Sequence, residues 1–442
     1  MHMRIHMKNY LMFVSLALAF FSCELRDEGP RVEPVNVTIQ VVFDGQFDGA
    51  GASDTEVLLR NVTSQQTYQG RTNSQGELIL PNIPSGIYDL TARRVFSRNE
   101  FLSFSGLKTE ENEVIFNASS SGININLAND RVLLTLKSGP VGNLLIKQIY
   151  FAGSDRVEGA LFRDQFIELY NNSNDTIYLD GWYVMGVLGR AATSVASFTL
   201  PNGQWDWQKS VGMPSSVRAN EDFLYGKWIY QFPGNGKTYP LAPGKEVVIA
   251  QTAVNHKAPF TGNDGVAVTV IRPELTVDLS RADFEVFLGS DFANPLNSDI
   301  DNPAVPNMRN IFIFGRDFIL DNPGREAVVI FKSDRPVQEF PMYATPNTTE
   351  IRDNTTLYYQ IPKNLIVDGV ECQPSPTNQV PIKLQNDIDA GYTFVPGGSF
   401  SSQSVIRKTA RKFGDRVILQ DSNNSEQDFT FFNIANPRGF AN

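Results

Sequence analysis

The chain has 442 residues, 41% of them hydrophobic and 19% charged, which is enough for about two to three domains with buried cores. Its 48 acidic side chains outnumber its 38 basic ones, so it lacks the positive surface that nucleic-acid phosphates require, and no nucleic-acid partner is expected. Two of the three histidines, His2 and His6, fall in an N-terminal leader, and only two cysteines are present. Histidine-based zinc sites are therefore not expected, and we predict no metal and no cofactor.

The first 22 residues are predicted to be a lipoprotein signal peptide. Residues 10–21 form an apolar run of 12 residues preceded by Arg4 and Lys8. This length suits a signal-peptide core and is too short for a membrane span. The run ends at Ser22-Cys23, which resembles a lipobox, and the resemblance implies that Cys23 is diacylated and becomes the new N-terminus. Ordinary signal-peptidase cleavage beside an incidental cysteine is the alternative.

Residues 23–34 are predicted to be an acidic tether. Several acyl chains on one residue exceed what stable anchoring needs, so the protein is expected to be held in the outer membrane by lipid at Cys23. Three acidic residues, Glu24, Asp27 and Glu28, follow the cysteine. This resembles the export signal of lipoproteins that face the cell exterior. A merely solvated tether is the alternative.

The segment 35–138 is predicted to be a β-sandwich. Every second residue from Val35 to Phe43 is apolar, which is the period of a half-buried strand. A glycine turn, a short strand and the motif PSGIYDL at 84–90 follow. This pattern resembles the carboxypeptidase-regulatory-like, prealbumin-type sandwich.

The remainder, 140–442, resembles a lamin-tail domain, an immunoglobulin-like sandwich. The resemblance rests on FIELYN at 166–171, on Gly181-Trp182 after a short strand, and on SVIR at 404–407 followed by DSNNSEQDF at 421–429. It implies that Val405, Arg407 and Phe429 close the body against strands at 143–150 and 165–170. The matching ends lie far apart in the sequence, so large insertions are expected near 186–238 and 251–400. The predicted fold class of the whole chain is all-β.

The complete arrangement resembles an uncharacterised family of bacterial outer-membrane lipoproteins, whose members are often encoded near TonB-dependent receptors. The resemblance implies a non-enzymatic cell-surface protein that binds a ligand or docks on an outer-membrane receptor, such as a TonB-dependent nutrient importer. A structural or adhesive surface protein is the first alternative, and a surface hydrolase is the second.

Motifs for catalysis are missing from the sequence. Neither a Gly-x-Ser-x-Gly elbow nor a His-Glu-x-x-His pair is present, so no catalytic residue is predicted. The segment GNGKT at 234–238 imitates the end of a phosphate-binding loop, but Gln231 stands where the first glycine would be. A glycine turn is the better interpretation of that segment.

An aromatic-rich stretch supplies the candidate contact residues. Trp205, Trp207, Trp228 and Tyr230 lie in a segment that is about twice as aromatic as the chain, and each pair is spaced by two, which places its members on one strand face. Tyr and Trp are enriched at binding surfaces because they combine an apolar ring with a polar edge. The alternative is that these residues form the core of the insertion.

Overall fold

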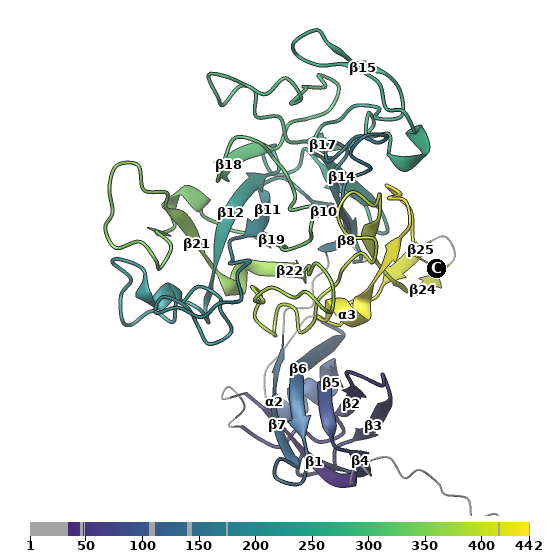
Figure 1. The fold of residues 1–442 in the computed structure, drawn as a ribbon, viewed down its shortest axis with the longest axis vertical. Coiled ribbons are helices and arrows are strands. Elements are labelled where there is room, and N and C mark those ends of the chain that lie inside the picture. The colour runs from purple at the N-terminus through teal and green to yellow at the C-terminus, as the bar shows by residue number, and fades with distance from the viewer. Residues whose placement is uncertain are drawn as a thin grey trace, which may run out of the picture.

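The computed structural model describes residues 34–44, 47, 49–105, 111–138, 144–173, 176–413 and 416–441. The predicted signal peptide, Cys23 and most of the predicted tether lie outside the described residues. The structure is all-β, as the sequence predicts, with several sheets, two short α-helices and a few single-turn 3-10 helices in the described ranges (Figure 1).

The described residues from 34 to 138, here called the N-terminal unit, form one seven-stranded sheet in the order β3-β2-β5-β6-β7-β1-β4. Burial alternates along β1 from Pro34 to Phe43, and this confirms the period-2 prediction for that strand. The buried residues of the strands make a core of their own, which includes Ile39, Tyr88 and Phe116. The elements are β1 (Pro34–Phe43), β2 (Glu56–Asn61), β3 (Thr67–Arg71), β4 (Glu77–Pro84), β5 (Gly86–Ser97), α2 (Arg98–Ser105), β6 (Glu113–Ile125) and β7 (Arg131–Ser138).

The described residues from 144 onward, here called the body, contain two large sheets. One has the order β17-β14-β9-β8-β23-β26. Its strands are β8 (Leu144–Tyr150), β9 (Phe166–Asn171), β14 (Glu246–Ala250), β17 (Phe284–Glu285), β23 (Ser404–Arg407) and β26 (Phe429–Phe432).

The other large sheet has the order β20-β21-β12-β11-β19-β22, with β18 paired to β12. Its strands are β11 (Trp182–Val187), β12 (Phe223–Gln231), β18 (Arg309–Ile313), β19 (Ala327–Lys332), β20 (Met342–Tyr343), β21 (Tyr358–Pro362) and β22 (Ile366–Glu371). The segments 186–238 and 251–400 therefore supply most of a central sheet of the body.

Short elements complete the body. Three two-stranded ladders join β10 (Ile177–Tyr178) to β13 (Pro240–Leu241), β15 (Phe260–Thr261) to β16 (Ala267–Val268), and β24 (Thr409–Phe413) to β25 (Arg416–Leu419). The helix α3 (Ser425–Asp428) precedes β26 and lies beside the N-terminal unit (Figure 1).

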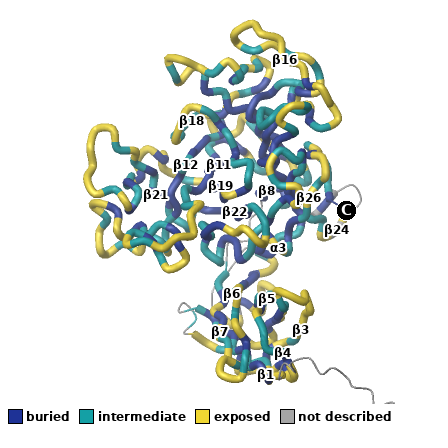
Figure 2. The backbone as a smooth tube through the Cα atoms, viewed as in Figure 1, coloured by how far each residue is buried: buried dark blue, intermediate teal, exposed yellow. Residues whose placement is uncertain are grey.

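The two large sheets of the body share one core. Residues of β8 and β9, such as Ile149 and Ile167, belong to the same buried cluster as Val184 of β11 and Ile330 of β19. Every residue of β8, β9 and β11 is buried, because these strands are covered on both faces. Figure 2 shows the buried backbone in the strands and the exposed backbone in the long loops around them.

The end of the chain closes the body as expected. Val405 pairs with Ile149, and Arg407 pairs with Phe429, so β23 lies between β8 and β26. The expectation that Val405 and Arg407 lie beside the strand at 143–150 is confirmed.

Candidate functional site

Three of the four predicted contact residues are buried. The exposed fraction is 4% for Trp207, 2% for Trp228 and 1% for Tyr230. The ring of Trp207 stacks on Tyr225 with centroids 3.5 Å apart, and Trp228 lies edge-on to Phe318 at 5.1 Å. A ligand could reach these rings only if the protein opened, so their burial favours the core interpretation.

Trp228 also fixes the neighbouring strand. Gly186 of β11 is its cross-strand partner, and a Cβ atom at Gly186 would lie 2.3 Å from the indole ring. Only glycine leaves room for the ring there. The indole Nε1 donates to Glu326 Oε1 at 3.2 Å, which satisfies its polar edge. This is the pattern of a core tryptophan.

Trp205 alone keeps an accessible face. It is partly exposed and contacts Phe198 at 5.7 Å, with the Arg190 guanidinium 5.4 Å from its ring centroid. It packs in a small cluster with Trp207, whereas Trp228 and Tyr230 belong to the main core. The four residues therefore do not form one surface, and Trp205 remains a candidate contact residue by itself.

The GNGKT loop binds a carboxylate of the protein itself. Asp180 Oδ1 accepts hydrogen bonds from the backbone N–H groups of Asn235 at 2.9 Å, Gly236 at 3.0 Å and Thr238 at 2.8 Å. The backbone donors that a phosphate loop would offer a ligand are thus already used. This supports the interpretation of the segment as a turn.

No helix in the described part of the chain is long and apolar enough to cross a bilayer. Among those same residues, no group of three or more His, Cys, Asp or Glu side chains is arranged to hold a metal ion.

The strongest candidate site is a groove of about 770 Å³ between the N-terminal unit and the body. Ligand pockets of small molecules span about 300–1,000 Å³, so the groove has the size of a binding site. Its lining combines planar polar groups, two aromatic rings and exposed aliphatic side chains. It consists of Arg60, Val62, Gln65, Ile87, Asp89, Ser121, Gly122, Pro376, Thr377, Gln379, Tyr392, Phe394 and Glu426.

The wall from the N-terminal unit is built by the outer face of its sheet. Buried and accessible residues alternate along β2, so Leu59 points into the core and Arg60 points outward. Arg60 pairs across the strands with Asp89 of β5, and its Nη2 lies 3.3 Å from Asp89 Oδ2. The other oxygen, Asp89 Oδ1, accepts from the N–H of Gly122 at 3.1 Å. The carboxylate is therefore held from two sides.

The wall from the body is a short extended segment. Thr393 pairs with the end of β22 through hydrogen bonds of 2.9 Å to Glu371 and Gln373, and its side chain is buried. Because neighbours in an extended chain point to the opposite side, Tyr392 and Phe394 face the groove together. Their ring centroids are 6.5 Å apart.

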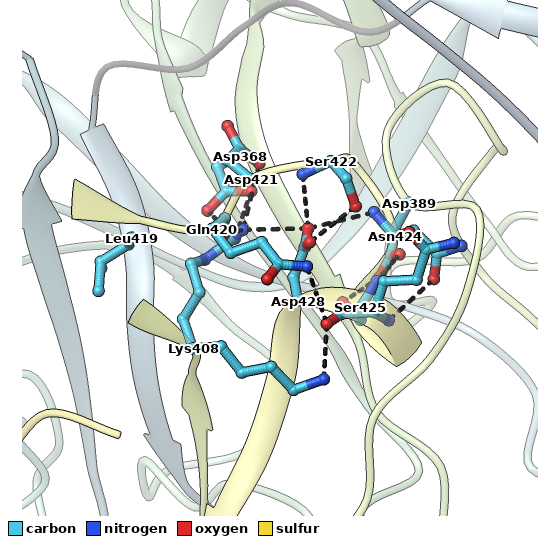
Figure 3. A network of polar contacts seen from close by, with 12 residues as sticks. Asp368, Asp389, Lys408, Leu419, Gln420, Asp421, Ser422, Asn424, Ser425 and Asp428 are labelled. Atoms are coloured by element: carbon cyan, nitrogen blue, oxygen red, sulfur yellow. Dashed lines mark hydrogen bonds and ion pairs between the residues drawn. The ribbon is translucent and has the colours of Figure 1, made fainter. Parts of the chain in front are cut away.

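A buried network holds this wall in place (Figure 3). Asp389 accepts hydrogen bonds from the backbone N–H of Glu371 at 2.8 Å, of Ser425 at 2.8 Å and of Gly391 at 3.1 Å. It therefore ties β22, α3 and the segment of Tyr392 to one carboxyl group. Burial raises the pKa of Asp389 to about 7, although these hydrogen bonds oppose the shift.

The turn before α3 is ordered by its own polar side chains. Asp428 accepts from the backbone N–H of Ser422 at 2.8 Å and from its hydroxyl at 2.7 Å. Asn424 caps the helix by accepting from the N–H groups of Glu426 and Gln427. Figure 3 shows these groups converging on Asp428 and Ser425. The motif at 421–429 is therefore a rigid corner, here called the acidic corner.

The acidic corner rests on the sheet of the N-terminal unit. Glu426 Oε1 lies 2.8 Å from Arg60 Nη2. The Asn117 amide donates to the carbonyl of Ser422, and the Ser119 hydroxyl donates to the carbonyl of Ala390. These contacts fix the two walls of the groove relative to each other.

The sequence did not predict the groove. Asp89 and the acidic corner both lie in segments that the sequence analysis identified, but as fold signatures. The polar groups become a site only because α3 meets β2 and β5. The lining contains no histidine, cysteine or lysine, and what it offers is hydrogen bonding and apolar contact.

Comparison with known proteins shows a shared fold and does not show an activity. Residues 242–434 match the model of the DUF4876 family, described as proteins of unknown function. A DUF4876 family protein from Bacteroides thetaiotaomicron is 24% identical, with 90% of this chain and 95% of that chain covered and a TM-score of 0.51. No curated protein matches the chain.

Other solved structures are more distant. A candidate adhesin from Bacteroides ovatus shares 10% identity over 76% of this chain and 84% of that one, with a TM-score of 0.19. Fervidolysin from Fervidobacterium pennivorans, a keratinolytic enzyme related to subtilisin, shares 13% over 50% and 31%, also with a TM-score of 0.19. The chain thus matches the DUF4876 family over residues 242–434 and shares the fold of one structurally characterised member.

Proposed function

We propose that this chain is a non-enzymatic cell-surface protein that captures a small polar ligand in the groove. The observation that carries the proposal is the composition of the groove. One wall presents the Arg60–Asp89 pair, and the other presents Tyr392 and Phe394, so polar and apolar contacts converge on one space. Binding sites for small molecules share this combination.

The buried supports of the groove favour binding over adhesion. A flat sandwich would present no groove, whereas here Asp389 and the acidic corner hold the two walls of the groove in fixed positions. A site whose walls are ordered before binding loses less entropy when the ligand arrives. The structural or adhesive role is therefore the weaker candidate.

The proposal includes the anchor and the partner that the sequence implies. Lipid at Cys23 would hold the protein in the outer membrane with the groove outside the cell. A bound ligand would then be available to an outer-membrane receptor, such as a TonB-dependent importer. Trp205 with its partners Phe198 and Arg190 is the partly exposed aromatic surface that such a receptor would contact.

Native mass spectrometry tests the proposed function. The mature chain, extracted in detergent, is incubated with the low-molecular-mass fraction of its growth medium. We expect a bound species on the wild type that is lost from Tyr392→Ala. The matched control is Tyr178→Ala, because Tyr178 is 37% exposed and does not line the groove. A wild type that captures nothing, or a Tyr392→Ala variant that captures as much, would refute the proposal.

A further inference from the structure

We infer that the ligand of the groove is a short neutral oligosaccharide. This inference rests on the proposed function and names the chemical class of the ligand. It depends on three features of the lining: the aromatic pair, the compensated charges and the two-sided pairing of β2 and β5.

The aromatic pair offers a platform for sugar rings. Tyr392 and Phe394 are half-buried, so each ring has one side fixed in the body and another open to the groove. The Tyr392 hydroxyl accepts from Gln379 Nε2 at 2.9 Å, which fixes the orientation of the ring. A pyranose carries its C–H groups on its faces, and an aromatic face is a large apolar surface against which those groups can pack.

Aliphatic side chains continue this surface on the opposite wall. Val62 and Ile87 line the groove and are 42% and 41% exposed. The N–H of Val62 donates to the carbonyl of Ile87 at 2.9 Å, so the two residues are held side by side. A ligand with apolar faces could be contacted from both sides.

The polar groups of the lining match hydroxyl groups. Guanidinium, carboxylate and amide side chains are planar, and each offers several donors or acceptors in a fixed geometry. Arg60, Asp89, Glu426 and Gln379 provide such groups around the same space. Vicinal hydroxyls of a sugar each donate and accept, so they can bind donors and acceptors together.

The charges of the lining disfavour an anionic ligand. Arg60 is the one cationic residue of the lining, and it is already paired with Asp89 at 3.3 Å and with Glu426 at 2.8 Å. No uncompensated positive charge therefore faces the groove from its lining residues. A phosphate, sulfate or uronate would meet two carboxylates, and that like-charge approach is unfavourable.

The strands β2 and β5 disfavour a peptide in extended conformation at this face. Such peptides bind by adding a strand to an open sheet edge. Of the strands under the groove, β2 lies between β3 and β5, and β5 lies between β2 and β6, so both are paired on both sides. The third strand, β6, pairs with β7 only at Phe116 and Asn117. Neither β2 nor β5 therefore offers an edge to such a peptide.

Isothermal titration of the mature chain in detergent tests the inference. The probes are neutral gluco-, manno-, xylo- and chito-oligosaccharides of two to four units, matched sulfated and uronic oligosaccharides, and tetrapeptides. We expect at least one neutral oligosaccharide to bind. Truncating a true anchor costs about 2 kcal/mol, so Tyr392→Ala and Phe394→Ala should each weaken it about 30-fold. Unfolding midpoints of both variants must stay close to that of the wild type, which separates lost contacts from lost structure.

Two control variants accompany the aromatic ones. Arg71→Ala removes an arginine that also pairs with two acidic residues of the N-terminal unit but does not line the groove, so it should bind like the wild type. Arg60→Ala should weaken binding. Equal affinity of Tyr392→Ala, Phe394→Ala and the wild type would overturn the inference.

The outcomes separate the inference from the proposed function. If only acidic oligosaccharides or peptides bind, and Tyr392→Ala abolishes that binding, the sugar class is wrong and the capture function stands. If no probe binds while the wild type still carries a ligand from the medium, the assignment of a neutral oligosaccharide is also wrong. If neither experiment detects a ligand, both proposals fail.

Discussion

Arg407 and Asp368 form a fully buried ion pair in which one guanidinium nitrogen contacts both carboxylate oxygens, at 3.0 and 2.8 Å. Arg407 Nε also donates to the carbonyl of Ile146 at 3.0 Å, and its Nη1 lies 3.1 Å from Asp421 Oδ1. One side chain thus joins β8, β22, β23 and the acidic corner. Burial alone would lower the pKa of Arg407, but the surrounding carboxylates raise it.

Arg407→Ala should strongly destabilise the body. It would leave Asp368, Asp421 and Asp428 close together without a cation, and removing one partner of a buried ion pair costs about 3–5 kcal/mol. The free energy of unfolding in denaturant measures the effect. Arg71→Ala is the control, because that ion pair is exposed and contributes little. Equal midpoints for Arg407→Ala and wild type would contradict the assigned role.

Asp389 should make stability decrease with rising pH. Burial raises its folded-state pKa from 3.8 to about 7, so the folded chain binds a proton that the unfolded chain releases. Its stabilising contribution is complete below about pH 4 and is lost as the pH rises through 7. Unfolding free energies of wild type and Asp389→Asn at pH 5 and pH 8 isolate this group from other carboxyls. A variant whose stability changes with pH as much as that of the wild type would exclude Asp389 as the source.

Trp207 and Trp205 should respond differently to truncation. Trp207→Ala empties a buried site stacked on Tyr225, and such a change costs about 3–5 kcal/mol. Trp205 is partly exposed, so Trp205→Ala should lower the melting temperature less. If Trp205 contacts a receptor, Trp205→Ala should reduce receptor co-purification without a matching loss of stability. Equal melting temperatures for Trp207→Ala and wild type would remove Trp207 from the core.

Truncation after residue 400 should make the body aggregate. The deletion removes β23 and β26, which exposes one edge of β8 and part of the main core. Open strand edges pair with other chains. Size-exclusion chromatography of the shortened chain measures the outcome. A monomeric fragment with a cooperative unfolding transition would show that the end of the chain is dispensable.

Cys23→Ala should release the protein from the membrane or block its processing. The reason is that the predicted acyl chains are attached at this residue, and stable anchoring depends on them. Fractionation of cells and the electrophoretic mobility of the product measure the effect. A variant that stays in outer membranes with wild-type mobility would show that the anchor lies elsewhere.

Local periodicity explains what could be predicted. The alternation from Val35 to Phe43 predicts β1, since burial on one face follows from the geometry of a strand. The motifs at 166–171 and 404–407 likewise coincide with β9 and β23. The aromatic spacing at Trp228 and Tyr230 predicts a shared strand face but not what covers it, because a core and a binding surface have the same pattern.

The sequence by itself therefore determined the all-β character, because strand periodicity depends on near neighbours, and its resemblance to a lamin-tail domain indicated the strands that close the body. Only the tertiary structure decided which polar groups lie close together. The GNGKT loop offers the same N–H donors to a phosphate or to Asp180, and the approach of that carboxylate selects between them. Arg60 and Glu426 come from opposite ends of the chain, and their 2.8 Å contact exists because α3, held on the body by Asp389, meets the sheet of the N-terminal unit. No local sequence pattern predicts such a contact, so the groove could be found only in the folded chain.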